Sequence, residues 1–294
     1  MTTNTSRWPV TIDGVRLDTL AYNISTRTGR DISPSVQGAN VESFARHGEL
    51  WTGHKKYGPG RMVLKMWVAG TDEDGVTPVD DYAKYRANLD KLLLMFNVRH
   101  RLLDVRQTIG ETGPVVRQAL CEVTEVIDPS MLAMSPYTAE MAVEFNIPGA
   151  FWFDVADTNY DSGAAYVSGT IKTLTPELLG ATAPMTDMYL VVDGPANSPK
   201  VWDNRSGHWV QYNGNLPSGQ QWCVNTATWS SKVGVGIAFT DTGTDVYAAT
   251  AFAGGHSPKL FGLVADPAAP QMRMEGTGFG ANTKFRVRTK RAYL

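Results

Sequence analysis

The strongest constraint on the fold lies in residues 137–154, where the sequence shows both a strand and the point at which it stops. Alternate residues from 139 to 147 are apolar, and the residues between them are mostly polar. This period of two predicts a strand with one face on a core and the other facing outward. Pro148 and Gly149 then end the strand, because proline has no N–H for a ladder and glycine lets the chain turn.

That stop falls near the middle of the 294-residue chain, and the composition changes after it. The second half holds the tryptophans Trp152, Trp202, Trp209, Trp222 and Trp229, out of 8 in the chain. A chain of this length that is 43% hydrophobic can build two cores of ordinary size. We therefore predict two domains, residues 1–149 and residues 150–294.

The first half is predicted to be mostly strands. Asp13 and Gly14 form a tight-turn signal between short apolar stretches, and further strands are expected at 22–26, 62–68, 102–106 and 115–127. Residues 27–60 are interrupted by glycines at 48, 53, 58 and 60. We interpret this stretch as a long loop or extended arm, which in a compact domain usually serves a function or folds against a neighbour.

One helix is predicted in the first half, at residues 78–96. Thr77 is expected to be its N-cap, and Pro78 suits the first helical position, where a missing N–H does no harm. Apolar side chains then recur at helical spacing and should pack on a sheet. They are Tyr82, Tyr85, Leu89, Leu92, Leu93 and Phe96.

The second half is predicted to be a β-sandwich, because short apolar runs alternate with turn clusters such as 204–207 and 217–219. Near the end of the chain, residues 284–290 alternate basic and apolar side chains. This pattern is typical of an edge strand protected by lysine, which we favour, although a subunit contact would also fit.

The composition disfavours several functions. With 27 Lys plus Arg against 29 Asp plus Glu, the net charge is -2, which gives no drive toward nucleic acid or anionic lipid. We find no signal peptide and no apolar run long enough to span a membrane. Cys121 and Cys223 are expected to be buried apolar residues rather than a disulfide. No motif points to a catalytic residue, a cofactor or a metal.

Aromatic residues of the second half are the candidates for ligand contact, because indole and phenol rings stack on sugars while nearby polar side chains bind hydroxyls. Asp203, Asn204, Asn213 and Gln221 are near in sequence. Core packing is the competing interpretation for each ring. The candidate glycan-contacting residues are Trp202, Trp209, Tyr212, Trp222 and Trp229.

The order of these features resembles the distal tail proteins, and related minor tail proteins, of bacteriophages with long non-contractile tails. The resemblance covers most of the chain. It is carried by Ile12-Asp13-Gly14-Val15, residues 57–64 and 67–70, the helix at 78–96, the strand end at 145–149, and residues 192–201 and 212–219.

The resemblance implies a tail-tube-like β-sandwich or split barrel with one helix, followed by a galectin-like or carbohydrate-module-like sandwich. It also implies a structural role: a ring, expected to be a homohexamer, that joins the tail tube to the host-binding tip and leaves a channel for DNA. The implied partners are the tail tube protein, the tail-tip hub protein, the tape-measure protein and host cell-surface glycan. The protein would sit at the virion tail tip after assembly in the host cytoplasm.

Two other classes stay open. A carbohydrate-binding adhesion protein would explain the second half but gives the first half no role. A glycoside hydrolase would need two carboxylates facing each other in a cleft, and the sequence alone cannot identify such a pair.

Overall fold

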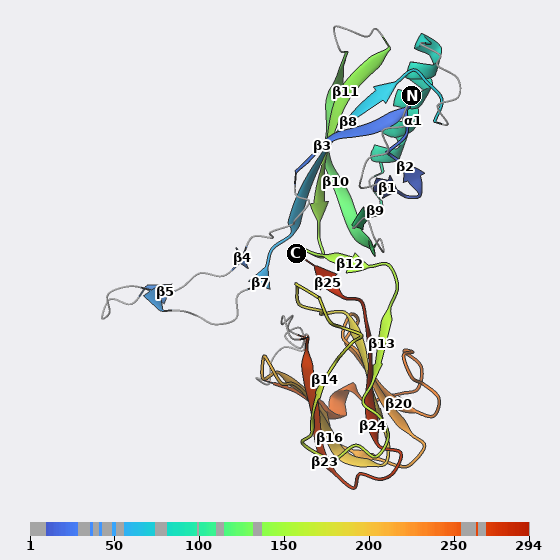
Figure 1. Cartoon of the computed structure of the whole chain (residues 1–294). Coiled ribbons are helices and arrows are strands. Elements are labelled where there is room, and N and C mark those ends of the chain that lie inside the picture. The colour runs from blue at the N-terminus through green and yellow to red at the C-terminus, as the bar shows by residue number, and fades with distance from the viewer. Residues whose placement is uncertain are drawn as a thin grey trace. The chain divides into compact units, whose positions relative to one another are not determined.

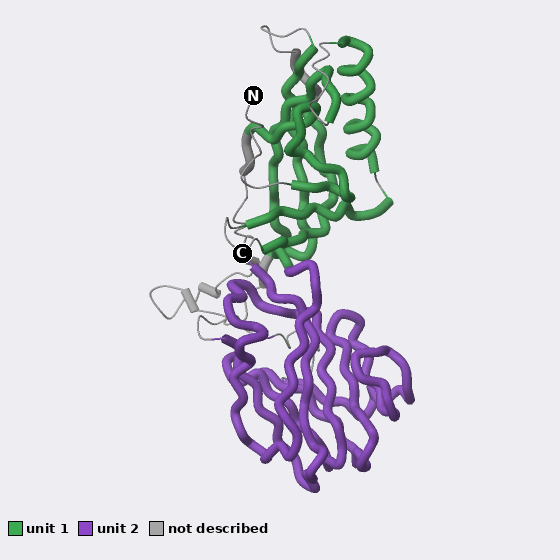
Figure 2. The backbone as a smooth tube through the Cα atoms, turned by 45° about the vertical axis from the view of Figure 1, so that its right-hand side comes forward, with its two compact units in different colours: residues 1–153, 294 green, residues 154–293 purple. Residues whose placement is uncertain are grey.

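The computed structural model describes residues 10–28, 36–37, 41–42, 49–50, 56–73, 81–98, 100–109, 115–131, 137–253, 263 and 269–293. The chain divides into two compact units (Figures 1 and 2). Unit 1 comprises residues 1–153 and 294, and unit 2 comprises residues 154–293. Strands dominate both units, which confirms the prediction of a mainly β chain with a helix in its first half.

Unit 1 is built on antiparallel strands in the order β2-β1-β9-β10-β11-β8-β3, with β12 also paired to β10. Its elements are β1 (Val10–Ile12), β2 (Val15–Arg16), β3 (Tyr22–Thr28), β4 (Val36–Gln37), β5 (Val41–Glu42), β6 (Glu49–Leu50), β7 (Lys56–Tyr57), β8 (Gly60–Ala69), α1 (Tyr82–Phe96), β9 (Leu103–Ile109), β10 (Val115–Met131), β11 (Thr138–Ile147) and β12 (Trp152–Asp154).

Two local predictions for unit 1 are confirmed. The turn between β1 and β2 has positive φ at both Asp13 (49°) and Gly14 (80°), as a tight hairpin turn requires. In β11, the apolar residues at odd positions from 139 to 147 are all buried, and the strand ends at Ile147 before a turn at 148–149.

The long strand β10 serves two ladders. Its first part, residues 115–121, pairs with β9, and its second part, from Glu122 to Met131, pairs with β11. The register with β11 shifts twice, between Val123 and Glu125 and again between Ile127 and Ser130. Such bulges bend and twist a strand, so one strand can pass from one sheet into the other.

The predicted arm at 27–60 contains two nested antiparallel ladders. The outer ladder pairs Val36 with Tyr57, and the inner ladder pairs Val41 with Leu50. The described residues of this stretch, which we call the excursion, therefore pair with one another in two short ladders, whereas the glycines suggested a long loop or extended arm.

Helix α1 begins later than predicted. Its N-cap is Asp81, whose carboxylate accepts a hydrogen bond from the Ala83 N–H at 2.8 Å, so the expected Thr77 cap is wrong for this helix. Residues 74–80 lie outside the described part of the chain. Leu92 and Phe96 are fully buried as predicted, whereas Tyr82 is 56% exposed. The Phe96 ring meets Phe145 of β11 edge to face, which packs the helix against the sheet.

Unit 2 is a sandwich of two antiparallel sheets, with orders β13-β24-β15-β19-β20-β21 and β14-β23-β16-β17-β22, the latter joined by β18 beside β16. Among its described residues, helix is limited to the turn η1. Its elements are β13 (Thr158–Asp161), β14 (Ile171–Thr173), β15 (Met188–Asp193), β16 (Ala196–Asp203), β17 (Trp209–Tyr212), β18 (Asn215–Leu216), β19 (Gln221–Asn225), β20 (Ser230–Gly234), β21 (Thr244–Asp245), η1 (Tyr247–Ala249), β22 (Thr250–Phe252), β23 (Gln271–Thr277), β24 (Lys284–Thr289) and β25 (Ala292–Tyr293).

The prediction of an edge strand at 284–290 is wrong. Strand β24 lies inside its sheet, between β13 and β15. The basic side chains that suggested an edge instead make contacts across the strands. Lys284 pairs with Asp161 at 2.6 Å, and Arg286 pairs with Asp193 at 2.7 Å.

The two ends of unit 2 are fastened to each other. The buried Asp154 carboxylate accepts from Arg291 Nε at 2.6 Å and from the Tyr293 hydroxyl at 2.9 Å. The Asp154 N–H also donates to the Arg291 carbonyl at 3.1 Å. The start of unit 2, at Asp154, is thus held beside the last strand of the unit, β25.

Both cysteines are free and buried, as predicted. Burial, with a smaller contribution from Asp104, raises the pKa of Cys121 to about 12, and burial also raises the pKa of Cys223. Within the described residues, no helix combines the length and apolar character needed to cross a membrane.

Candidate functional site

The five candidate aromatic residues do not form one site, because the alternation of β17 sends neighbouring rings to opposite faces. Val210 is buried, and Trp209 lies on the outward side of the strand. Tyr212 is an odd number of residues from Trp209, so it points to the inner side. The candidates therefore separate into an inner pair, an outer pair and Trp229.

The inner pair joins the two sheets. The Trp222 ring of β19 is fully buried and stacks on Tyr212 of β17, with ring centroids 5.9 Å apart and an interplanar angle of 27°. Trp222 Nε1 donates to Ser231 Oγ at 2.9 Å, and that hydroxyl lies 2.7 Å from Thr250 Oγ1 on the other sheet. Trp222 is thus a core residue whose ring cannot reach a ligand outside the sandwich.

The outer pair is set by strand register. Trp202 of β16 lies directly opposite Trp209 of β17, and their ring centroids are 6.0 Å apart. Lys200, two residues before Trp202, is on the same face. Its Nζ lies 4.1 Å from the Trp202 ring centroid and 3.9 Å from that of Trp209, so one ammonium contacts both indoles.

A second cation approaches Trp202 from β23. Arg273 is in register with Trp202, and its guanidinium carbon lies 4.7 Å from the indole centroid. Glu275 is engaged twice: it accepts from Trp202 Nε1 at 2.9 Å and pairs with Arg273 at 3.1 Å. We call Lys200, Trp202, Trp209, Arg273 and Glu275 the outer aromatic face.

Trp229 lies elsewhere, in the turn between β19 and β20. It has a positive φ of 55°, and its ring meets Phe252 edge to face at 5.4 Å. These contacts favour a local packing role for Trp229.

The polar residues expected near the rings also separate. The fully buried Asp203 accepts from the N–H groups of Arg205 and Ser206, which shapes the turn between β16 and β17. Gln221 donates to Asp193, its register partner on the neighbouring strand β15 of the same sheet, away from the sheet that carries Trp202 and Trp209. Asn204 does reach the outer aromatic face, since its Oδ1 accepts from Arg273 at 3.0 Å.

Sequence reasoning missed the charged members of this face. Lys200 had a usable signal, because the same face of a strand repeats every second residue and Trp202 is two positions on. Arg273 and Glu275 alternate with the buried Met272 and Met274, which marks their strand but not its neighbour. Their register with β16 is long-range and has no local signal.

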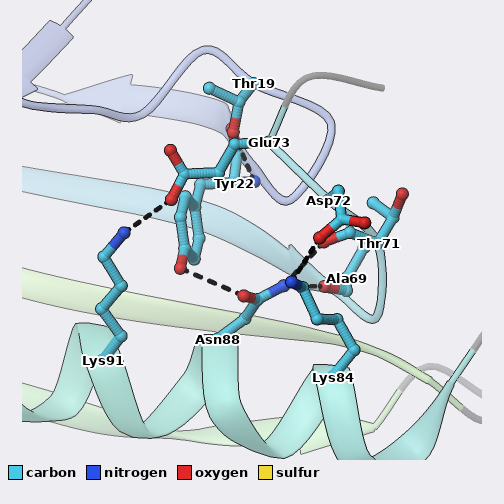
Figure 3. A network of polar contacts seen from close by, with 9 residues as sticks. All are labelled: Thr19, Tyr22, Ala69, Thr71, Asp72, Glu73, Lys84, Asn88 and Lys91. Atoms are coloured by element: carbon cyan, nitrogen blue, oxygen red, sulfur yellow. Dashed lines mark hydrogen bonds and ion pairs between the residues drawn. The ribbon is translucent and has the colours of Figure 1, made fainter. Parts of the chain in front are cut away.

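Unit 1 holds a second cluster of polar side chains, between β3, the end of β8 and α1 (Figure 3). The buried Asn88 donates to the carbonyls of Ala69 and Thr71 at 2.8 and 2.9 Å, and its Oδ1 accepts from the Tyr22 hydroxyl at 3.3 Å. Burial, together with Glu73, raises the pKa of Tyr22 to about 12.

A surface groove of about 440 Å³ runs beside Asn88, lined by Asp72, Glu73, Lys84, Ala87, Asn88 and Lys91. Its charges are already matched: Lys91 pairs with Glu73 at 2.6 Å, and Lys84 pairs with Asp72. Because each of these charges has a partner and the amide of Asn88 is used on both sides, we interpret the cluster as the fastening of the helix to the sheet. Across the described residues, His, Cys, Asp and Glu form no group of three suited to a metal.

The fold defines a class of two-unit β proteins in which a helix-bearing sheet unit precedes a β-sandwich. No protein-family model matches the chain, and no curated protein matches it in sequence. Among solved structures, the chain is similar in fold to the SPP1 Dit (gp 19.1) protein, described as a paradigm of the hub adsorption apparatus in phages that infect Gram-positive hosts. The TM-score is 0.57 at 10% identity, covering 98% of this chain and 100% of that one.

Proposed function

We propose that the chain is a structural protein of a bacteriophage tail, located at the distal end of the tail. The observation that carries the proposal is the fold similarity to SPP1 Dit, which extends over both units and over the full length of that chain. A shared β-sandwich alone would match many unrelated proteins. The similarity here spans 98% of this chain, so it includes both units in the same order.

The finer form of the proposal is a ring of identical subunits, hexameric, that joins the tail tube to the host-binding tip and leaves a channel for DNA. Unit 1 would form the ring. A ring needs head-to-tail interfaces that close by rotation. The excursion at 27–60 supports this, because a strand pair only two residues long in each ladder gains little stability by itself and would be stabilised by a neighbouring subunit.

The test is assembly. Purified full-length protein would be imaged by electron microscopy alone and after mixing with the tail tube, tail-tip hub and tape-measure proteins of the same phage. We expect closed rings, formed alone or only on these partners. A protein that stays monomeric with all three partners would refute the ring.

The excursion is tested by deleting residues 31–55. We expect this variant to keep the cooperative thermal unfolding of the full chain and to lose ring formation. A matched control replaces residues 31–55 with a flexible Gly-Ser linker of the same length. Rings formed normally by either variant would remove the excursion from the interface.

The proposal contains no catalytic step. We therefore expect no release of reducing sugar when the protein is incubated with host cell-wall polysaccharide. Release that a single Asp or Glu substitution abolishes would favour the hydrolase alternative instead.

A further inference from the structure

The outer aromatic face of unit 2 differs from a simple sugar-stacking platform, because cations already contact its rings. Lys200 lies against both indoles, and Arg273 contacts Trp202 as well. A neutral sugar that stacked on Trp202 would have to displace a cation that the ring attracts. The half-buried indoles alone therefore do not define the ligand.

The charges of this face are not balanced. Glu275 lies opposite Lys200 in register, but its carboxylate pairs with Arg273 and accepts the Trp202 N–H. Within the described part of the chain, no carboxylate forms an ion pair with the Lys200 ammonium. Two cations thus face one acid, and the indoles hold the ammonium of Lys200 at a fixed place on the sheet.

We propose that this face binds an acidic glycan, with a carboxylate or phosphate group of the glycan accepting from Lys200. The apolar side of the adjoining sugar would lie along Trp209, against which the described residues place a single cation, Lys200. A charge-assisted hydrogen bond to a fixed ammonium supplies the attraction, and the indole supplies apolar contact area.

Single-stranded nucleic acid is the less suitable polyanion. Its bases bind by stacking on free aromatic faces along a strongly basic groove. Here cations already lie against the rings, and among the described residues the face holds two cations, Lys200 and Arg273, beside the carboxylate of Glu275. A glycan with one charge in every one or two sugars fits such a site better.

The inference rests on the proposed function only for the source of the glycan, the host surface. Binding is measured on the full-length protein in solution by calorimetry and tryptophan fluorescence, so its failure is distinct from failure of ring formation. The probes are hyaluronan hexasaccharide for carboxylate, phosphomannan for phosphate, dextran as the neutral control, and oligo(dT).

We expect at least one acidic glycan to bind about tenfold or more tightly than dextran, with affinity falling as salt rises. Dextran binding as tightly as both acidic glycans would overturn the role of charge. Absence of binding by hyaluronan and phosphomannan at millimolar sugar would overturn the site. Oligo(dT) binding as tightly as either glycan would overturn the assignment to glycans.

Variants locate the site. Lys200→Met and Trp209→Leu should each weaken acidic-glycan binding by about tenfold, and Lys200→Arg should retain most of it because the charge and the ring contact persist. The charge-matched control is Lys284→Met on the other sheet, where Lys284 is paired with Asp161. Equal losses in Lys200→Met and Lys284→Met would show a general charge effect and refute the site. Thermal unfolding of each variant checks that it is folded.

Discussion

Each unit holds two layers together at a buried aromatic ring, but by different interactions: unit 1 joins a helix to a sheet, and unit 2 joins two sheets. In unit 1, the ring of Tyr22 lies under α1, and the tie to the helix is polar: one amide, Asn88, binds the Tyr22 hydroxyl and two backbone carbonyls. In unit 2, the main contact between the sheets is the stack of Trp222 on Tyr212. The indole N–H adds a hydrogen bond to the Ser231 hydroxyl, which lies beside the hydroxyl of Thr250.

This difference predicts that substitutions at the two rings reduce the stability of the fold for different reasons. Apolar stacking contributes through buried area, so truncating the ring leaves a cavity. A polar tie contributes little net free energy, yet removing one partner leaves the others buried and unpaired. Substitutions in the two units should therefore differ in size and in their dependence on pH.

The largest effect is expected for Trp222→Ala, which should lower the free energy of unfolding by about 3–5 kcal/mol because a fully buried ring is lost. Urea unfolding followed by circular dichroism measures it. The control is Trp209→Ala on the outer aromatic face, with an expected loss below about 1 kcal/mol. Similar losses for the two variants would contradict the division into inner and outer rings.

The next effect is expected for Asn88→Ala, at about 1–3 kcal/mol, because the Tyr22 hydroxyl and two carbonyls lose their partner. Asn146→Ala is the matched control, since Asn146 bonds Glu122 in an exposed setting on β11 and should cost under about 0.5 kcal/mol. A fall in the unfolding midpoint no larger than that of the control would mean that the polar tie does not stabilise unit 1.

A smaller effect concerns alkaline pH. The pKa of Tyr22 is raised from 10.0 to about 12 by burial and Glu73, so the folded state retains a proton that the unfolded state releases. The stability that the protonated Tyr22 hydroxyl contributes to the folded state is fully present below about pH 10 and is lost as pH rises through about 12.

The variant Tyr22→Phe isolates this contribution from the tyrosines of unit 2, whose pKa values burial also raises. The gap in urea midpoint between wild type and Tyr22→Phe should narrow between about pH 10 and pH 12. A constant gap over that range would show that Tyr22 titrates at its ordinary pKa in the folded protein.

The smallest effect concerns Asp241 of unit 2. A hydrogen bond from Ser230, at 2.5 Å, is the main cause that lowers its pKa, with Asn225, Tyr189 and Lys232 adding to it. The stability that ionised Asp241 contributes to the folded state is present above the ordinary pKa of 3.8 and is lost as pH falls below that value. Asp241→Asn should therefore show a slightly flatter acid limb in a pH-dependent thermal melt, and an acid limb identical to wild type would refute the contribution.

Features set by neighbouring residues were predictable from the sequence, and those set by distant pairing were not. The alternation in β11 and the Asp13-Gly14 turn depend on local chemistry and were found. The position of β24 inside its sheet was not predicted. A strand with charged outer side chains has the same sequence pattern whether it lies at the edge of a sheet or between two other strands. Its acid partner Asp161 is 123 residues away in sequence.

The candidate site shows the same limit. The turn cluster expected at 204–207 is present, and the hairpin around it pairs Trp202 with Trp209, a pairing that was not predicted from the sequence. Trp209 and Tyr212 are an odd number of residues apart, which already indicated that their rings lie on opposite faces of the strand. Asn88 was overlooked because an amide within an apolar helical stripe has no partner until the sheet is placed under it.

The fastening of Asp154 to Arg291 and Tyr293 has a consequence for how such a chain can change. A module whose two ends meet can be exchanged as a cassette, since the host chain needs only one insertion point and no long connection. Different sandwiches could thus be grafted after residue 153 while unit 1 keeps its own sequence. The ion pair between Asp154 and Arg291 would close each exchanged module, so a grafted sequence would need to include both residues.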